Sequence, residues 1–210
     1  MIKIEVVLFD WNNTIVNDFG VWWNAIRETF RVFGKKEPTI REYFEGLTGD
    51  YLDFYKQRGI NASREELNKI YEASYERRIN EIILFPGVKE FFDFLNRRLI
   101  AVGLVTQQKD FLISPLLKKF GLNEYLSYYE CHALDKKETI CQILRHEKIE
   151  PKKCCFVGDA PSDINHGKKA GVITIAFLTK NIPEDLIVAV KPDFTIKNLE
   201  EIRAIVKRSS

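Results

Sequence analysis

The chain has 210 residues, of which 45% are hydrophobic and 30% are charged, a composition typical of a soluble globular protein with one sizeable core. Its 32 basic and 30 acidic residues leave a formal charge of +2, which gives no support for a nucleic-acid-binding surface. No apolar run approaches the roughly 18 residues that span a bilayer, and the first nine are too few for a secretory signal, so we expect a cytoplasmic protein without a membrane partner.

The first predicted element is a buried strand over residues 6–9, which read Val, Val, Leu and Phe. This strand leads into Asp10 and then into a polar turn, Trp11-Asn12-Asn13-Thr14. A carboxylate at the carboxyl end of a buried strand lies where open α/β sheets bind their ligands. Taken alone, Asp10 is equally consistent with a residue that caps the following helix.

The segment from residue 16 to residue 83 shows helical patterns only. Apolar residues recur at steps of three and four between Val21 and Phe33, and Pro38 opens a second predicted helix. A third covers residues 51–58. Ser63 and Glu66 form a capping box that starts a fourth helix, which we expect to continue to about residue 82. We therefore predict a helical insert, and direct packing of these helices on the sheet is the alternative.

From Pro86 onward, predicted strands alternate with predicted helices. We expect strands over residues 100–105, 128–131, 154–157, 172–177 and 194–196, and helices over residues 88–97, 110–120, 136–146, 162–170, 183–188 and 199–207. Such alternation is typical of a doubly wound parallel sheet, so the predicted class is α/β.

Polar side chains follow several of these strands. The strand over 100–105 ends at Thr106, and the strand over 154–157 continues into Asp159, with Asp163 four residues later. Lys136 begins a predicted helix directly after Asp135. If the strands are parallel neighbours, these groups converge with Asp10 on one edge of the sheet.

These motifs, in this order, resemble those of the haloacid dehalogenase-like hydrolase superfamily, especially its phosphoglycolate phosphatase-like branch. The matching residues are Asp10-Trp11-Asn12-Asn13-Thr14, Thr106, Lys136 and Gly158-Asp159-Ala160-Pro161-Ser162-Asp163. The resemblance covers almost the whole chain. It implies a Rossmann-like core made of residues 1–15 and 84–210, and an α-helical cap made of residues 16–83 that closes over the active site.

The resemblance also implies a Mg²⁺-dependent phosphatase that hydrolyses a small phosphomonoester through an aspartyl phosphate on Asp10. The implied metal ligands are Asp10, the backbone carbonyl of Asn12, Asp159 and, directly or through a water, Asp163. Hard oxygen ligands of this kind suit Mg²⁺. The expected partner is a small phosphorylated metabolite, which the sequence does not name further.

The remaining implied roles concern the phosphate. Thr106 and the backbone N–H at Gln107 are expected to bind its oxygens, and Lys136 is expected to pair with both the nucleophile and the phosphate. Lys137 is the alternative to Lys136, because no proline follows to fix the register of this motif.

Asn12 is the main departure from the family pattern, which usually has a second Asp at this position to exchange protons. An amide can orient a water but cannot exchange a proton near pH 7. Since general acid–base help is worth ~10²–10⁴ in rate, we predict slow turnover or restriction to good leaving groups. His132 is considered as a substitute base. Asn13 stands where the family usually has Gly, and Asn tolerates the left-handed backbone that a tight turn needs.

Two other functions remain open for this sequence. Family members that act on carbon–halogen or carbon–phosphorus bonds also lack the second Asp, so a 2-haloacid dehalogenase or a phosphonatase-like hydrolase is the first alternative. A catalytically weak protein that keeps the phosphate and metal site as a ligand sensor is the second. Dehalogenation needs no metal and would leave Asp159 and Asp163 without a role.

Overall fold

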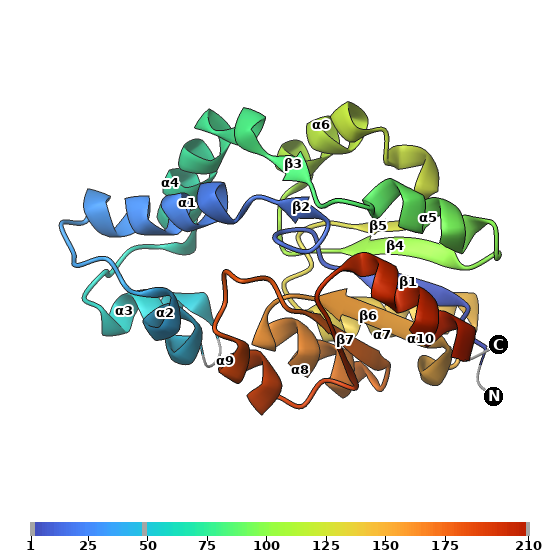
Figure 1. Ribbon diagram of the computed structural model, residues 1–210. Helices are drawn as coiled ribbons and strands as arrows, with labels where there is room; N and C mark the ends of the chain where they lie inside the picture. The colour runs from blue at the N-terminus through green and yellow to red at the C-terminus, as the bar shows by residue number, and fades with distance from the viewer. Residues whose placement is uncertain (1–2, 48–49, 209–210) are drawn as a thin grey trace.

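The computed structural model describes residues 3–47 and 50–208 (Figure 1). Six strands form one parallel sheet in the order β5-β4-β1-β6-β7-β8. Their bounds are β1 (Val6–Phe9), β4 (Ala101–Val105), β5 (Leu126–Glu130), β6 (Cys154–Gly158), β7 (Ile173–Phe177) and β8 (Phe194–Ile196). The chain builds β4 and β5 on one side of β1 and then crosses to build β6, β7 and β8 on the other. The predicted doubly wound α/β fold is confirmed.

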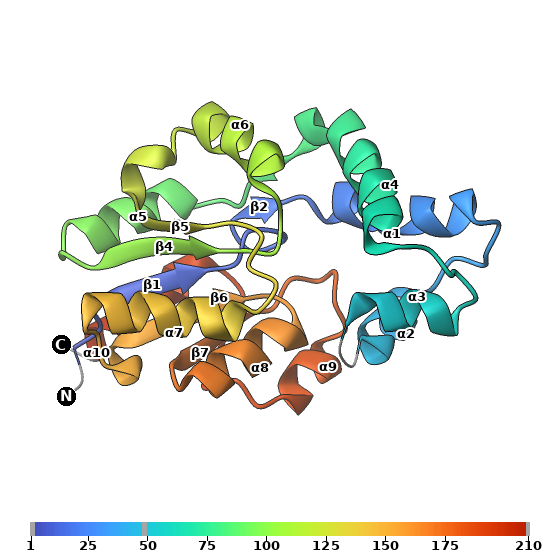
Figure 2. The ribbon, with the colours of Figure 1, turned by 180° about the vertical axis from the view of Figure 1, so that it is seen from behind.

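Helices cover both faces of this sheet (Figures 1 and 2). The side chains of β1 alternate, so that Val7 and Phe9 enter one apolar core while Val6 and Leu8 enter the other. The first face packs against α5 (Val88–Asn96), α6 (Asp110–Phe120) and α10 (Ile202–Arg208), and the second against α7 (Lys136–Glu147), α8 (Pro161–Ala170) and α9 (Glu184–Ala189). Short 3₁₀ turns, η2 (Asn123–Tyr125), η3 (Pro151–Lys153) and η4 (Leu199–Glu201), precede β5, β6 and α10.

The helical insert leaves and rejoins the core through a pair of very short strands. β2 (Val16–Asn17) pairs antiparallel with β3 (Ile83–Leu84). Between them lie α1 (Phe19–Val32), α2 (Ile40–Gly46), α3 (Tyr51–Gln57) and α4 (Arg64–Arg77), which share an apolar cluster of their own. Figure 1 shows these helices at the end of the molecule opposite the N- and C-termini. The expectation of helices alone in this segment was wrong, because two-residue strands carry no periodic signal.

Capping residues decide where two of these helices begin. The predicted capping box of Ser63 and Glu66 is confirmed, with both hydrogen bonds formed at the start of α4. A second capping box, Thr39 with Glu42, starts α2 two residues later than Pro38 had suggested. α4 ends at Arg77 rather than near residue 82, and the chain continues into the 3₁₀ turn η1 (Ile79–Glu81).

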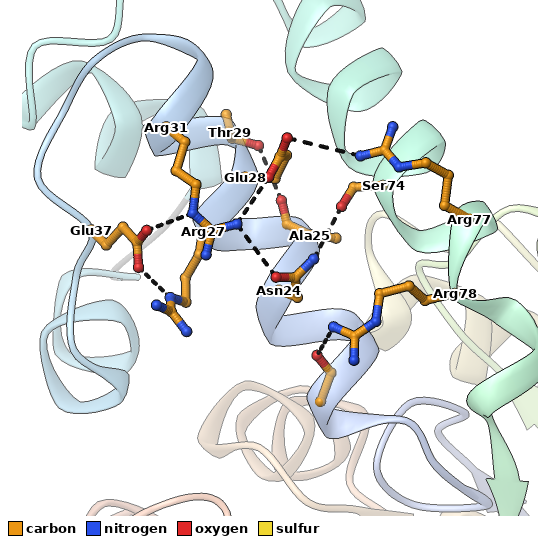
Figure 3. A network of polar contacts seen from close by, with 11 residues as sticks. Asn24, Ala25, Arg27, Glu28, Thr29, Arg31, Glu37, Ser74, Arg77 and Arg78 are labelled. Carbon is orange, nitrogen blue, oxygen red and sulfur yellow. Dashed lines mark hydrogen bonds and ion pairs between the residues drawn. The ribbon is translucent and has the colours of Figure 1, made fainter.

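Polar contacts hold the two long helices of the insert together (Figure 3). The Asn24 amide on α1 donates to the Ser74 hydroxyl on α4 at 3.5 Å, and Arg78 donates to the Gly20 carbonyl at 3.4 Å. Arg27 and Arg31 on α1 both bind Glu37, which fixes the chain that leaves the end of the helix. Exposed pairs of this kind contribute little individually, so the apolar cluster supplies most of the insert's stability.

The insert also touches the core away from the β2–β3 pair. Arg41 on α2 makes a two-pronged ion pair with Asp185 on α9, with both N–O distances at 2.9 Å. A second contact joins α4 to the loop after β4, where the Lys109 ammonium lies 2.6 Å from Glu72. These contacts place the helices over the carboxyl end of the sheet. No helix in residues 3–47 and 50–208 has both the length and the apolarity needed to cross a membrane.

Candidate active site

Three adjacent strands deliver polar residues to the carboxyl edge of the sheet. Phe9, the last residue of β1, is paired with Leu104 on β4 and with Val157 on β6. Asp10 follows directly, and its backbone N–H donates to the Val157 carbonyl at 2.9 Å. In this register Thr106 and Asp159 each lie one residue beyond the level of Asp10. Parallel pairing on both sides of β1 therefore accounts for the meeting of segments that are far apart in the sequence.

Three carboxylates and one ammonium form the centre of this site. One oxygen each of Asp10, Asp159 and Asp163 lie within 4.8 Å of one another, and all three residues are buried. The Lys136 Nζ atom, also buried, lies 2.6 Å from Asp10 Oδ1 and 2.7 Å from Asp163 Oδ1. Lys136 is thus the residue that meets the nucleophile candidate, whereas the half-buried Lys137 pairs with Glu138 at 3.4 Å.

The start of α8 holds Asp163 in place. Asp163 is the third residue of this helix, and its Oδ2 accepts a hydrogen bond from the Ala160 backbone N–H at 3.1 Å. The helix also lies very close to the end of β6. A Cβ atom on Gly158 would stand 2.4 Å from the Cβ of Asp163. Only glycine at residue 158 lets this carboxylate reach the cluster.

Burial and repulsion between the carboxylates make it costly to ionise Asp10 and Asp159. Burial raises the pKa of Asp10 to about 6, although Lys136 lowers it in part. Burial also raises the pKa of Asp159 well above its usual range, and the charges of Asp163 and Asp10 raise it further. For Lys136, burial lowers the pKa, but the two carboxylates outweigh burial, so the net pKa of the ammonium is raised. Lys136 is therefore a permanent cation beside an excess of negative charge.

The donor set fits a hard divalent cation. The three carboxylates converge, are shielded from solvent and are only partly balanced by one ammonium. Mg²⁺ prefers oxygen ligands and commonly uses a few carboxylates together with water and substrate phosphate. An added double positive charge would offset the repulsion that raises the pKa of Asp159.

Besides Lys136, the residues expected to hold the phosphate are Thr106 and Gln107, and neither of their side chains is bonded to the carboxylates. The buried Thr106 hydroxyl accepts a hydrogen bond from the Gln108 backbone N–H at 3.2 Å. The Gln107 side chain is exposed and donates to the Leu134 carbonyl at 3.4 Å. Thr106 continues β4 next to Asp10, so its hydroxyl belongs to this edge. His132 is exposed, with a φ of 54°.

The sequence profile of the haloacid dehalogenase-like hydrolases matches residues 7–177. The chain belongs to that family. A phosphoglycolate phosphatase from Synechococcus elongatus is 24% identical over 207 residues, covering 95% of this chain and 95% of that protein. The pyrophosphatase PpaX of Listeria monocytogenes is 26% identical over 214 residues, covering 98% of this chain and 97% of that protein. A hydrolase from Pseudomonas syringae has the same fold, with a TM-score of 0.81 at 14% identity, covering 98% of this chain and all of that one.

In this haloacid dehalogenase-like hydrolase, Asn13 supports the carboxylate cluster. Its φ of 55° confirms the left-handed turn predicted at this position. The Asn13 amide donates to Asp159 Oδ2 at 2.5 Å and to the Thr179 hydroxyl at 2.8 Å, and its oxygen accepts from Asn181 at 2.9 Å. The Thr14 hydroxyl donates to the second Asp159 oxygen at 3.2 Å. Asparagine here adds contacts that glycine cannot make.

Asn12 of this hydrolase faces a second acidic residue that the sequence did not single out. Its Nδ2 atom lies 2.5 Å from Asp18 Oδ2 and 3.3 Å from the Tyr75 hydroxyl. Asp18 is only 1% exposed, and burial raises its pKa to about 6. In the sequence, Asp18 stands just before a predicted helix, where Asp is common as a cap. Tyr75 falls on the repeating apolar face of α4 and gave no separate signal.

Proposed function

We propose that the protein is a Mg²⁺-dependent phosphatase that hydrolyses a small phosphomonoester through an aspartyl phosphate on Asp10. The observation that carries this proposal is the meeting of the Asp10, Asp159 and Asp163 carboxylates around Lys136 at the carboxyl edge of the sheet. A carboxylate attacks phosphorus only where nearby cations offset the charges of the two anions. This site supplies an ammonium and three converging carboxylates that suit a divalent cation.

The proposed ligands of Mg²⁺ are the Asp10, Asp159 and Asp163 side chains and the backbone carbonyl of Asn12. A bound divalent cation polarises phosphoryl oxygens and neutralises charge that develops during transfer. Asn13 and Thr14 hold the two oxygens of Asp159, which limits the orientations of this ligand before any ion binds. Lys136 holds Asp10 and Asp163 in the same way.

In the proposed reaction an Asp10 oxygen forms a bond to phosphorus while the bond from phosphorus to the leaving oxygen breaks. Water then attacks the aspartyl phosphate and releases inorganic phosphate. Lys136 stabilises the charge on the phosphoryl group in both steps, and the Thr106 hydroxyl and the Gln107 backbone N–H bind its oxygens. The permanent charge of Lys136 suits this electrostatic role better than proton transfer, since its net pKa is raised.

The helices over residues 16–83 are proposed to act as a cap on a core made of residues 1–15 and 84–210. Their contacts with residues 108–109, which follow β4, and with α9 support this proposal. The relatives named phosphoglycolate phosphatase and pyrophosphatase support a small phosphorylated substrate. Asn12, which cannot exchange a proton, favours substrates whose leaving group departs readily as an anion.

The proposal is tested by assaying p-nitrophenyl phosphate and a panel of small phosphate esters with and without Mg²⁺. We expect hydrolysis that requires Mg²⁺ and is lost in Asp10→Asn, with rates that fall as the leaving group becomes more basic. Metal-independent halide release from a 2-haloacid would instead favour the dehalogenase alternative. Tight binding of phosphate esters without turnover would favour a ligand sensor.

A further inference from the structure

The Asp18 carboxylate is a buried junction between three segments of the chain. Its Oδ2 accepts from the Asn12 amide at 2.5 Å and from the Tyr75 hydroxyl at 2.7 Å, and its Oδ1 accepts from the Asn13 backbone N–H at 2.8 Å. Asn12 and Asn13 belong to the turn that follows Asp10, whereas Tyr75 lies on α4, 57 residues further along the chain than Asp18. Asp18 itself immediately precedes α1.

Helix capping does not account for this residue. Asp18 stands at the N-cap position of α1, but its side chain makes no capping hydrogen bond to that helix. Both carboxylate oxygens instead point back to the turn after β1 and across to α4. Burying a carboxylate is costly unless its oxygens are well bonded, so these three donors are a specific arrangement rather than a by-product of helix formation.

The arrangement requires a carboxylate, because donors approach both of its oxygens. An amide at residue 18 would turn its NH₂ group either toward the Asn13 N–H or toward the Asn12 and Tyr75 donors. The same chemistry fixes Asn12. Only the Nδ2 edge of the Asn12 amide can face an acceptor, so Oδ1 lies on the opposite edge and is presented as a hydrogen-bond acceptor.

The junction also reaches the phosphate-binding side of the site through the insert. The Tyr75 ring stacks on Tyr71, with centroids 5.8 Å apart. The Tyr71 hydroxyl accepts from the Gln108 amide at 3.1 Å, and the Gln108 backbone N–H donates to Thr106 at 3.2 Å. Helix α4 therefore contacts both the turn after β1 and the loop after β4.

We propose that Asp18 is a positioning residue for the phosphatase reaction: it fixes the orientation of the Asn12 amide and, through Tyr75, couples that orientation to the position of α4. This inference rests on the proposed function. In the fixed orientation Asn12 Oδ1 can accept a hydrogen bond from the attacking water, while no group at residue 12 supplies a proton to the leaving oxygen. Movement of α4 away from the core would remove the Tyr75 bond and loosen this arrangement.

The coupling has a direct consequence for attempts to restore the usual acid–base residue. In Asn12→Asp alone, a new carboxyl group would face Asp18 at hydrogen-bond distance, and two carboxyl groups so close cannot both be ionised. In the exchange variant Asn12→Asp/Asp18→Asn, one amide and one carboxylate are kept, with their positions reversed. The exchange therefore regains the pair, whereas the single substitution does not.

The test compares wild type, Asp18→Asn, Asn12→Asp, the exchange variant and Tyr75→Phe by steady-state kinetics on p-nitrophenyl phosphate with Mg²⁺. We expect Asp18→Asn to lower kcat roughly tenfold to hundredfold with little change in KM. We expect the exchange variant to exceed both single variants in kcat. Tyr75→Phe removes one donor to Asp18 and the 3.3 Å contact with Asn12 but keeps the bond between Asp18 and Asn12, so it should lower kcat by less than Asp18→Asn does, with little change in KM. Asp53→Asn, on the exposed side of α3, is the matched control and should change neither.

A second measurement does not depend on turnover. The side-chain NH₂ signals of Asn12 in a ¹⁵N–¹H spectrum are assigned by their loss in Asn12→Asp, and Asp18→Asn should shift them while Asp53→Asn does not. Unshifted signals, an unchanged kcat in Asp18→Asn, or a higher kcat in Asn12→Asp than in the exchange variant would each overturn the inference. Failure of the wild type to hydrolyse any phosphate ester would overturn the proposed function instead, and the Asn12 signals would still test the role of Asp18.

Discussion

The turn that follows β1 contacts two buried groups, one with three acids and one with a single acid, and they are built in opposite ways. Asp10, Asp159 and Asp163 crowd together around one ammonium, which leaves an excess of negative charge. Asp18 stands among neutral donors from Asn12, Asn13 and Tyr75. The first group fits a site that receives a cation and an anionic substrate. The second is already satisfied by the protein, so its role is to hold neighbouring groups in place.

The largest expected effect comes from removing the proposed nucleophile, Asp10. Asp10→Asn keeps the size of the side chain but cannot form the aspartyl phosphate, so we expect kcat to fall by on the order of 10³-fold or more. The measurement is Mg²⁺-dependent hydrolysis by freshly purified protein. Activity within tenfold of wild type would separate Asp10 from the chemistry and would remove the distinction between the two groups.

Removing the ammonium should destabilise only the first group. Lys136→Met leaves three buried carboxylates without a positive partner, and we expect a loss of about 3–5 kcal/mol in the free energy of unfolding without metal. The control is Lys137→Met, which removes a neighbouring and more exposed charge and should cost no more than about 0.5 kcal/mol. Urea unfolding in a chelator measures both, and equal losses would contradict the assignment of Lys136.

The second group predicts a pH effect on metal-free stability. Burial raises the pKa of Asp18 from 3.8 to about 6, so the native state holds this proton more tightly than the unfolded state. The resulting stability is fully present below about pH 4 and is lost as the pH rises through about 6, by roughly 3 kcal/mol. The free energy of unfolding of wild type and of Asp18→Asn is measured across this range. As the pH rises, the stability of wild type relative to Asp18→Asn should fall. A constant difference would contradict the prediction.

Mg²⁺ should stabilise through the first group alone. At 100 times the dissociation constant we expect about 2.7 kcal/mol of added stability, which calorimetry would detect as a higher melting temperature. Asp159→Asn should lose most of this gain, because it removes a proposed ligand that Asn13 and Thr14 hold in place. Asp18→Asn should keep it. Equal losses in both variants would mean that the two groups act as one.

The sequence was sufficient to predict most of the sheet and the convergence of Asp10, Asp159 and Asp163 at its edge. The buried strands that lead into Asp10, Thr106 and Asp159 are found from apolar runs followed by polar residues, and parallel pairing then brings their ends together. The spacing from Lys136 to Ile140, the first aliphatic residue of its helix, also favoured Lys136 over Lys137, because it fits the family pattern better. The side-chain contact with Asp10 at 2.6 Å, however, came only from the fold.

The second group could not be found in the same way. Asp18 resembles an ordinary helix cap, and Tyr75 resembles one more apolar position on α4. Their hydrogen bond depends on how the insert folds back across 57 residues, which no local pattern records. The β2–β3 pair was missed for a similar reason, since strands of two residues owe their existence to the closure of the insert rather than to their own sequence.

The most direct test of the account is mass spectrometry of the protein quenched in acid during turnover of a phosphate ester with Mg²⁺. We expect one phosphoryl group, located on the peptide that contains Asp10 and missing from both Asp10→Asn and the chelated enzyme. Steady hydrolysis with no such adduct in pre-steady-state samples, or an adduct on any other residue, would contradict an aspartyl phosphate at this site.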